Sequence, residues 1–266
     1  MMATATGSLS RRDLNVLEKI KDPEYTPLMG VTVDPNLPKD PNVTDSSTYE
    51  HVARKEREIV HLLQQLEMRL ASLNSTATAK LIQDYRERVQ DFGDLISEYP
   101  KYASVRNNRA QALRRLFGDK MLLPGIQDPA ALIPDASDIE RTQAADTTLS
   151  DLDEAIKLLT PQNTVAPISI QAGKTLSLAH TQRAAIFHMT AKVMQPESVI
   201  LGSKRKEASW SKIDFETAAS RDFSLGGRYG NDIAKGLAVN TNPTAKLCGE
   251  MVREAMKKEY GPEFAV

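Results

Sequence analysis

From residue 47 onward, apolar side chains recur at three- and four-residue steps, which is the spacing of one face of an α-helix. The stretch 102–119, YASVRNNRAQALRRLFGD, shows the pattern clearly. Pro100 precedes it, and Gly118 stands where helices commonly close in the left-handed conformation. The stretch is therefore predicted to be a buried helix with marked ends. Its apolar positions are Ala103, Val105, Ala110, Ala112, Leu113, Leu116 and Phe117.

The same periodicity predicts partner helices on both sides of this stretch. The preceding pair carries apolar residues at 59, 62, 63, 66, 70 and 73, and then at 81, 82, 85, 89, 92 and 96, and it ends at Pro100. Later runs stop at Pro161 and resume near residue 175. We therefore predict an all-α fold with three helix pairs inside residues 47–241, at about 54–100, 101–161 and 175–222.

Proline-rich stretches separate and precede the helices. Residues 120–143 contain three prolines and residues 195–209 lack helical periodicity, so both are predicted to be insertions between helices. Residues 1–46 read as an N-terminal arm with a short helix at 11–21 and an extended part punctuated by prolines. The extended part either lies against the folded body or forms a linker.

The C-terminal segment 242–266 is predicted to be a capping helix. Pro243 suits a first helical turn, and an apolar stripe follows it. Gly226, Gly227 and Gly230 are expected to form a flexible joint before it. Because the open end of a helical stack must be covered, we expect the stripe to be buried, and deletion of 243–266 to unfold or aggregate the protein. The stripe consists of Leu247, Cys248, Met251, Val252, Ala255 and Met256.

Composition narrows the possible partners and the compartment. Charged residues make up 26% of the 266 residues, yet the net charge is only -1, so no overall field favours nucleic acid or anionic lipid. The single Cys248 provides no disulfide framework. No apolar run has the length of a signal peptide or a membrane span, and the expected location is the cytoplasm.

The sequence contains only weak matches to catalytic, nucleotide-binding or metal-binding motifs. Gly173-Lys174-Thr175 lacks the earlier glycine of a phosphate-binding loop, because Ile168 occupies that position. The four histidines show no metal-ligand spacing and are expected at the surface or in packing. Lys204-Arg205-Lys206 could be a nuclear signal or an anion patch, and otherwise a solvated loop. We therefore expect no enzymatic activity, cofactor or metal.

Two stretches resemble a known repeat. NNRAQAL…GD, from Asn107, resembles the first helix of a tetratricopeptide repeat, and DLDEAI, from Asp151, resembles the second helix. In addition, NPTAKLCGEM, from Asn242, and LNVLEKIKDPEYTP, from Leu14, are similar to the ends of the tetratricopeptide repeat protein thirty-six family. The resemblance implies three stacked repeats, and a DnaK-type heat-shock chaperone as a partner.

In such a stack the first helices of the pairs line a concave groove. Guanidinium, ammonium and amide groups there would suit a peptide carboxylate, although a solvated helix surface is the alternative for residues 107–109. The resemblance implies an arginine at position 182 and a lysine at position 178, but this chain has Gln182 and Leu178. This departure weakens the match to repeats that bind an acidic chaperone tail. The predicted groove residues are Arg54, Lys55, Arg57, Asn107, Asn108, Arg109, Gln182 and Arg183.

These observations favour a non-catalytic adaptor or co-chaperone that holds a chaperone, a client protein, or both. The alternative is a stabilising partner of a single metabolic enzyme, as a tyrosine-catabolism link in the family would suggest. Such a partner would grip the enzyme with the N-terminal arm and with the loops 120–143 and 195–209. A third class, an enzyme in its own right, has no candidate residues in the sequence.

Overall fold

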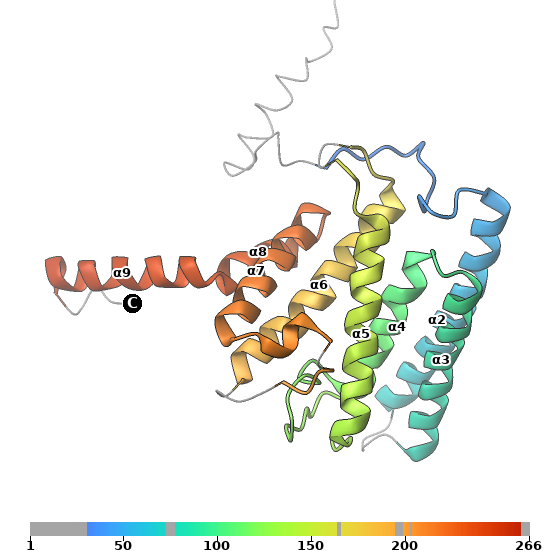
Figure 1. Ribbon diagram of the computed structural model, residues 1–266, viewed down its shortest axis with the longest axis horizontal. Helices are drawn as coiled ribbons and strands as arrows, with labels where there is room; N and C mark the ends of the chain where they lie inside the picture. The colour runs from blue at the N-terminus through green and yellow to red at the C-terminus, as the bar shows by residue number, and fades with distance from the viewer. Residues whose placement is uncertain (1–30, 73–77, 164–165, 195–198, 203, 262–266) are drawn as a thin grey trace, which may run out of the picture.

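The computed structural model describes residues 31–72, 78–163, 166–194, 199–202 and 204–261 (Figure 1). Within these ranges the regular structure is helical apart from one isolated β-bridge, which confirms the predicted all-α fold. The short helix predicted at 11–21 lies outside the described residues. The helices are α2 (Ser46–Ser72), α3 (Ala79–Glu98), α4 (Ala103–Phe117), α5 (Asp138–Leu159), α6 (Ile170–Val193), the 3₁₀ helix η1 (Lys206–Ser209), α7 (Lys212–Arg228), α8 (Asp232–Thr241) and α9 (Pro243–Tyr260).

Consecutive helices pack as pairs, and the pairs stack side by side (Figure 1). The pairs are α2 with α3, α4 with α5, and α6 with α7. Helix α4 contacts α3, α5 and α6 and lies at the centre of the stack. Its alanines, such as Ala103 and Ala110, are fully buried, because small side chains allow the neighbouring helices to approach closely. The predicted stack of helix pairs is therefore confirmed.

Helix α5 begins earlier than the sequence analysis predicted. Ser137 accepts a hydrogen bond from the backbone N–H of Glu140, and the Glu140 carboxylate accepts one from the backbone N–H of Ser137, which together form a capping box. The three prolines of this region all precede Ser137, so nothing interrupts the helix after it. Residues 138–143 are therefore the first turns of α5 and do not belong to the predicted insertion.

The remaining insertion, residues 118–137, packs against the stack. Met121, Leu122 and Leu123 are buried, and the carbonyl oxygen of Leu122 accepts a 2.8 Å hydrogen bond from the backbone N–H of Ile200. The two inserted segments therefore contact each other. Gly118 starts this loop with a φ of 79°, and a Cβ atom there would lie 2.4 Å from a carboxylate oxygen of Asp128.

The extended part of the N-terminal arm lies against the body from residue 31 onward. Val33 forms a parallel bridge with Ile168, and the Asn42 side chain donates a 2.9 Å hydrogen bond to the carbonyl oxygen of Leu158. The buried Asp40 carboxylate accepts from the backbone N–H of Ala103. The arm thus supplies a carboxylate acceptor at the N-terminus of α4, and burial raises the pKa of this carboxyl group.

The C-terminal region differs from its prediction in two ways. Gly226 and Gly227 are not a joint but lie inside α7, where Cβ atoms would meet Thr181 at 2.5 Å and Lys235 at 2.8 Å; the glycines let α6 and α8 approach. Helix α9 forms as predicted, but it projects away from the stack, and none of its residues is buried (Figure 1). The prediction that this helix buries its stripe as a cap is therefore wrong.

Candidate functional site

A groove of about 870 Å³ is lined mainly by α2 and α4, and also by Tyr85 and Phe92 of α3 and Met189 of α6. Val60 and Leu63 of α2, and Ala112 of α4, give it an apolar floor. Its cations are already paired: Arg115 contacts Glu67 of α2 at 2.9 Å, and Arg114 contacts Asp119 at 2.7 Å. Because these arginines are neutralised within the chain, the groove suits an apolar segment better than an acidic tail.

The three predicted groove residues on α2 make contacts within the pair of α2 and α3. Lys55 pairs with Glu98 of α3 at 2.7 Å, Arg54 contacts His51 at 3.1 Å, and Arg57 donates to the carbonyl oxygen of Ala53. None of the three lines the groove described above. The structure does not bring Arg54, Lys55 and Arg57 together with the other predicted residues.

Asn107, Asn108 and Arg109 point in three directions, because consecutive residues of an α-helix are about 100° apart. The buried Asn107 side chain accepts a 2.8 Å hydrogen bond from Gln182 of α6. Asn108 donates a 2.8 Å hydrogen bond to Glu56 of α2. These two asparagines therefore link α4 to the first helices of the neighbouring pairs.

Glu56 is a buried acid between the first two pairs. Its carboxylate also accepts a 2.6 Å hydrogen bond from the hydroxyl of Tyr102. Burial raises the pKa of Glu56, although hydrogen bonds from Tyr102, Ser104 and Asn108 act in the opposite direction. Asn108, the expected peptide-binding asparagine, is thus committed to a partner within the chain.

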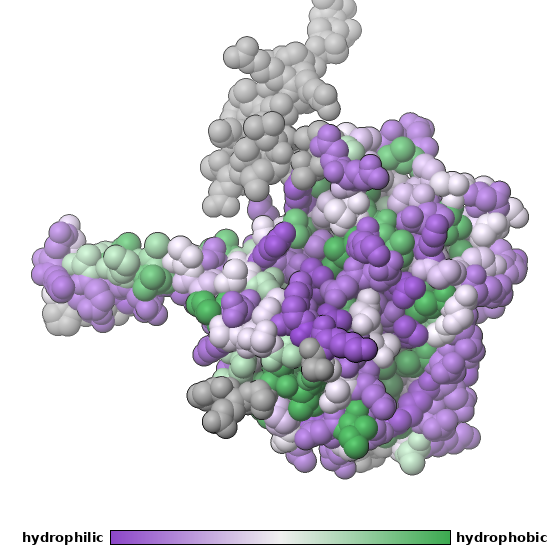
Figure 2. All heavy atoms as spheres, viewed as in Figure 1, coloured by the Kyte–Doolittle hydropathy of each residue, from purple (hydrophilic) through white to green (hydrophobic). Residues whose placement is uncertain are grey.

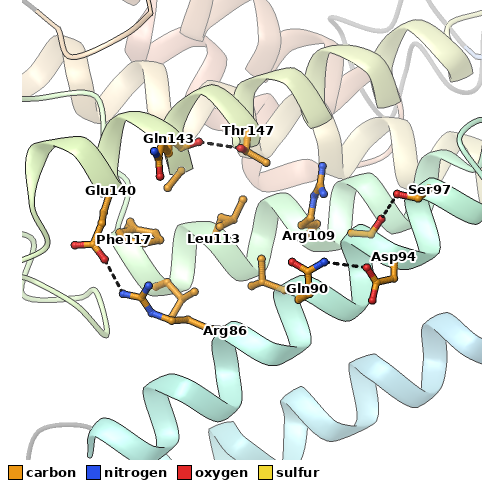
Figure 3. Close-up of a pocket in the computed structure, with 14 residues that line it drawn as sticks. Arg86, Gln90, Asp94, Ser97, Arg109, Leu113, Phe117, Glu140, Gln143 and Thr147 are labelled. Atoms are coloured by element: carbon orange, nitrogen blue, oxygen red, sulfur yellow. Dashed lines mark hydrogen bonds and ion pairs between the residues drawn. The ribbon is translucent and has the colours of Figure 1, made fainter.

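Arg109 faces away from the groove, into a second hollow formed by α3, α4 and α5 (Figure 3). Its guanidinium forms two hydrogen bonds, of 2.6 and 2.8 Å, with Asp151 of α5, and Arg106 also contacts this carboxylate at 3.2 Å. The side chain of Asp151 is only 1% exposed. Across the hollow, Arg86 of α3 pairs with Glu140 of α5 at 3.0 Å (Figure 3). Arg109 therefore joins α4 to α5 through an ion pair with the buried Asp151.

Gln182 and Arg183 also form hydrogen bonds to other residues of the stack. The amide of Gln182 donates to Asn107 and accepts a 3.2 Å hydrogen bond from Arg114, so it joins α6 to α4. Arg183 makes two hydrogen bonds with Asp222 of α7, at 2.7 and 2.8 Å, and one with Asp153 of α5. A glutamine at position 182 can both donate and accept, which an arginine could not do.

Of the eight predicted groove residues, only Asn108 lines the groove. The sequence analysis missed the pairs Arg115–Glu67 and Arg114–Asp119 that neutralise it. The five-residue separation of Arg114 and Asp119 across the helix end was a usable signal, because Gly118 turns the chain back there. Glu67 and Arg115 lie on two different helices, 48 residues apart, so no local sequence pattern indicates that they pair.

The described residues offer a second surface on α9. An apolar stripe, which we call the α9 stripe, follows one side of this helix, and charged side chains follow the other (Figure 2). The stripe consists of Leu247, Cys248, Met251, Val252, Ala255 and Met256, all of them exposed. The ammonium of Lys246 pairs with Glu216 of α7 at 3.1 Å, close to the base of the helix.

No group of three or more histidine, cysteine or acidic side chains within the described ranges could hold a metal ion. Likewise, none of the described helices is long and apolar enough to span a bilayer.

This fold and these surfaces define a stack of helix pairs similar to tetratricopeptide repeats. The chain is 34% identical over 254 residues to the L-tyrosine degradation gene cluster protein hmgX of Aspergillus fumigatus, which covers 95% of this chain and 93% of that protein. It belongs to the family of that protein. It is also 28% identical over 182 residues to tetratricopeptide repeat protein 36 of Danio rerio, across 68% of this chain and 66% of the relative. No family model and no solved structure matches the chain.

Proposed function

We propose that this protein is a non-catalytic partner that binds and stabilises one enzyme of L-tyrosine degradation. The observation that carries the proposal is the α9 stripe, an apolar surface on a helix of 18 residues that has no buried residue. The name of the Aspergillus fumigatus relative, a protein of an L-tyrosine degradation gene cluster, supports the choice of pathway.

The exposure of the α9 stripe points to a partner. Leu247, Met251 and Val252 are 57%, 65% and 59% exposed. Contiguous exposed apolar surfaces are rare on proteins that act alone, and an apolar helix face commonly fills a groove on another protein. An isolated helix of this length is marginal in water, so binding would also stabilise the helix itself.

The balance of charged residues on α9 favours a protein partner over a membrane surface. Helix α9 carries four basic residues, at 246, 253, 257 and 258, and three acidic residues, at 250, 254 and 259. Membrane-surface helices are typically rich in lysine and arginine on the polar face and draw affinity from anionic lipid. A nearly balanced polar face instead suits the mixed charges found at the rim of a protein interface.

The second candidate function is an adaptor for a DnaK-type chaperone. It is favoured by the groove along α2 and α4 and by the similarity to tetratricopeptide repeat protein 36. Since Arg114 and Arg115 are paired with carboxylates, such an adaptor would hold an apolar segment of the chaperone or of its client. This candidate does not require the α9 stripe.

The test is a binding assay between the purified full-length protein and each purified enzyme of L-tyrosine degradation, with a purified DnaK-type chaperone as a parallel sample. We expect one enzyme to bind, and Met251→Glu to weaken that binding by at least about tenfold, because a charge would enter an apolar interface. Arg253→Glu is the matched control, since Arg253 lies on the polar side of the same helix.

Failure of every enzyme to bind would refute the proposal. Binding of the chaperone alone, unaffected by Met251→Glu, would establish the second candidate in its place. Because none of the residues of α9 is buried, both substitutions should leave the thermal midpoint of unfolding unchanged, so a loss of binding cannot be attributed to unfolding.

A further inference from the structure

A separate pocket of about 700 Å³ lies between the C-terminal end of α5, helix α6, η1 and helix α7. We call it the α6–α7 pocket. It does not include the groove along α2 and α4, nor any residue of the α9 stripe. A volume of this size accommodates a small organic molecule. The nature of its walls, its floor and its rim indicates which class of molecule would fit.

The walls are aromatic. Trp210 packs against Phe187 of α6 with ring centroids 5.3 Å apart and an interplanar angle of 63°. At the other end, Tyr229 stacks on His180 with an interplanar angle of 3°. Trp210 and Tyr229 are only partly buried, so each also presents ring surface to the pocket. Such surfaces favour contact with a flat, apolar group.

The floor is a set of polar and charged side chains that already pair with one another. His180 Nδ1 lies 2.9 Å from a carboxylate oxygen of Asp222, and Arg183 binds the same carboxylate through two hydrogen bonds. Beside them, the buried Glu207 pairs with Arg205 at 3.1 Å. The contacts of Asp222 join α6 to α7, and the pair of Arg205 with Glu207 is local to η1. Because these side chains are already paired with one another, the floor gives a ligand a surface to fit against and no unpaired charge to bind.

The rim, by contrast, carries positive charge. The ammonium of Lys206 lies 5.6 Å above the centre of the Trp210 ring, and Arg221 projects from α7 as an exposed side chain. Among the residues that the structure describes, neither has a carboxylate within ion-pair distance. The nearby acid Asp214 accepts hydrogen bonds from Ser211 in the capping box of α7. The rim therefore favours an anion.

We propose that the α6–α7 pocket binds a small aromatic carboxylate. The ring would lie against Trp210 and Phe187, and the carboxylate would reach Lys206 and Arg221 at the rim. Guanidinium and ammonium groups form their strongest hydrogen bonds with carboxylates, and aromatic walls select a ring over an alkyl chain. This inference does not depend on the proposed protein partner, because the pocket and the α9 stripe share no residue.

The test is titration of the full-length protein with phenylacetate, followed by tryptophan fluorescence and by isothermal titration calorimetry. Trp210 is the only tryptophan of the chain, so its emission reports on this pocket alone. We expect saturable binding with a dissociation constant between about 10 µM and 1 mM, as for other small ligands of few atoms. Hexanoate, which lacks the ring, and benzyl alcohol, which lacks the charge, should each bind at least about tenfold more weakly.

The double substitution Lys206→Gln/Arg221→Gln should weaken phenylacetate binding by at least about tenfold. Its matched control is Lys212→Gln, which removes an exposed charge at the start of α7 outside the pocket lining and should leave the affinity unchanged. Absence of saturable binding, equal binding of hexanoate or benzyl alcohol, or an equal effect of Lys212→Gln would each overturn the proposal.

Discussion

Replacement of Arg109 by alanine should destabilise the fold, because it breaks a buried ion pair rather than a partner contact. Asp151 is 1% exposed and would retain only Arg106, at 3.2 Å, as a cationic partner. Removing one member of a fully buried pair costs about 3 to 5 kcal/mol. Since Arg109 is 20% exposed and Arg106 remains, we expect a loss of about 2 to 3 kcal/mol.

For a chain of this size, such a loss lowers the thermal midpoint of unfolding by about 5 to 10 °C. The assay is thermal unfolding followed by circular dichroism. The control is Lys55→Ala, which breaks an ion pair of similar length whose members are 38% and 48% exposed. Exposed pairs contribute little, so the control should leave the midpoint nearly unchanged. Equal shifts of the thermal midpoint for the two variants would refute the claim that the ion pair of Arg109 with Asp151 stabilises the fold.

Three further predictions concern other parts of the stack. Gly118→Ala should destabilise the protein by about 3 kcal/mol in urea unfolding and Gly125→Ala by about 1 kcal/mol, because both glycines have positive φ but only the first would strike Asp128. Burial acts to raise the pKa of Asp222, but hydrogen bonds from Arg183 and His180 outweigh it and hold the pKa below its usual value. The ionised carboxylate therefore stabilises the fold at neutral pH, and acid unfolding of Asp222→Asn should depend less on pH below about 4. Deletion of 243–266 should leave the thermal midpoint nearly unchanged, since none of the residues of α9 is buried and the ion pair of Lys246 with Glu216 is partly exposed.

Much of the stack could be predicted from the sequence. Helix ends are set locally, by prolines such as Pro100 and by the capping glycine Gly118, and the apolar spacing of α4 identifies the residues that are buried. The start of α5 was missed although its signal, Ser137 followed three residues later by Glu140, is present in the sequence. The three prolines just before Ser137 predict a loop through the same stretch and so obscure the capping box.

The candidate site could not be predicted in the same way. An apolar stripe shows that a helix has an apolar side, but not whether the surface that covers it belongs to the same chain. The sequence of α9 therefore predicts a cap where the structure has an exposed helix. Similarly, the partners of Asn108 and Arg109 lie 52 and 42 residues away, beyond any local pattern. Substituting this pair would perturb the stack itself and would not isolate a binding surface.

The most direct test of the proposed function measures the thermal inactivation of the bound enzyme of L-tyrosine degradation in the presence of this protein. Wild-type protein and Arg253→Glu should lengthen the half-life of the enzyme, because a partner that binds only the folded enzyme stabilises it by mass action. Met251→Glu and the 243–266 deletion should give no protection. An unchanged half-life with wild-type protein, or equal protection by the deletion variant, would contradict the role assigned to the α9 stripe.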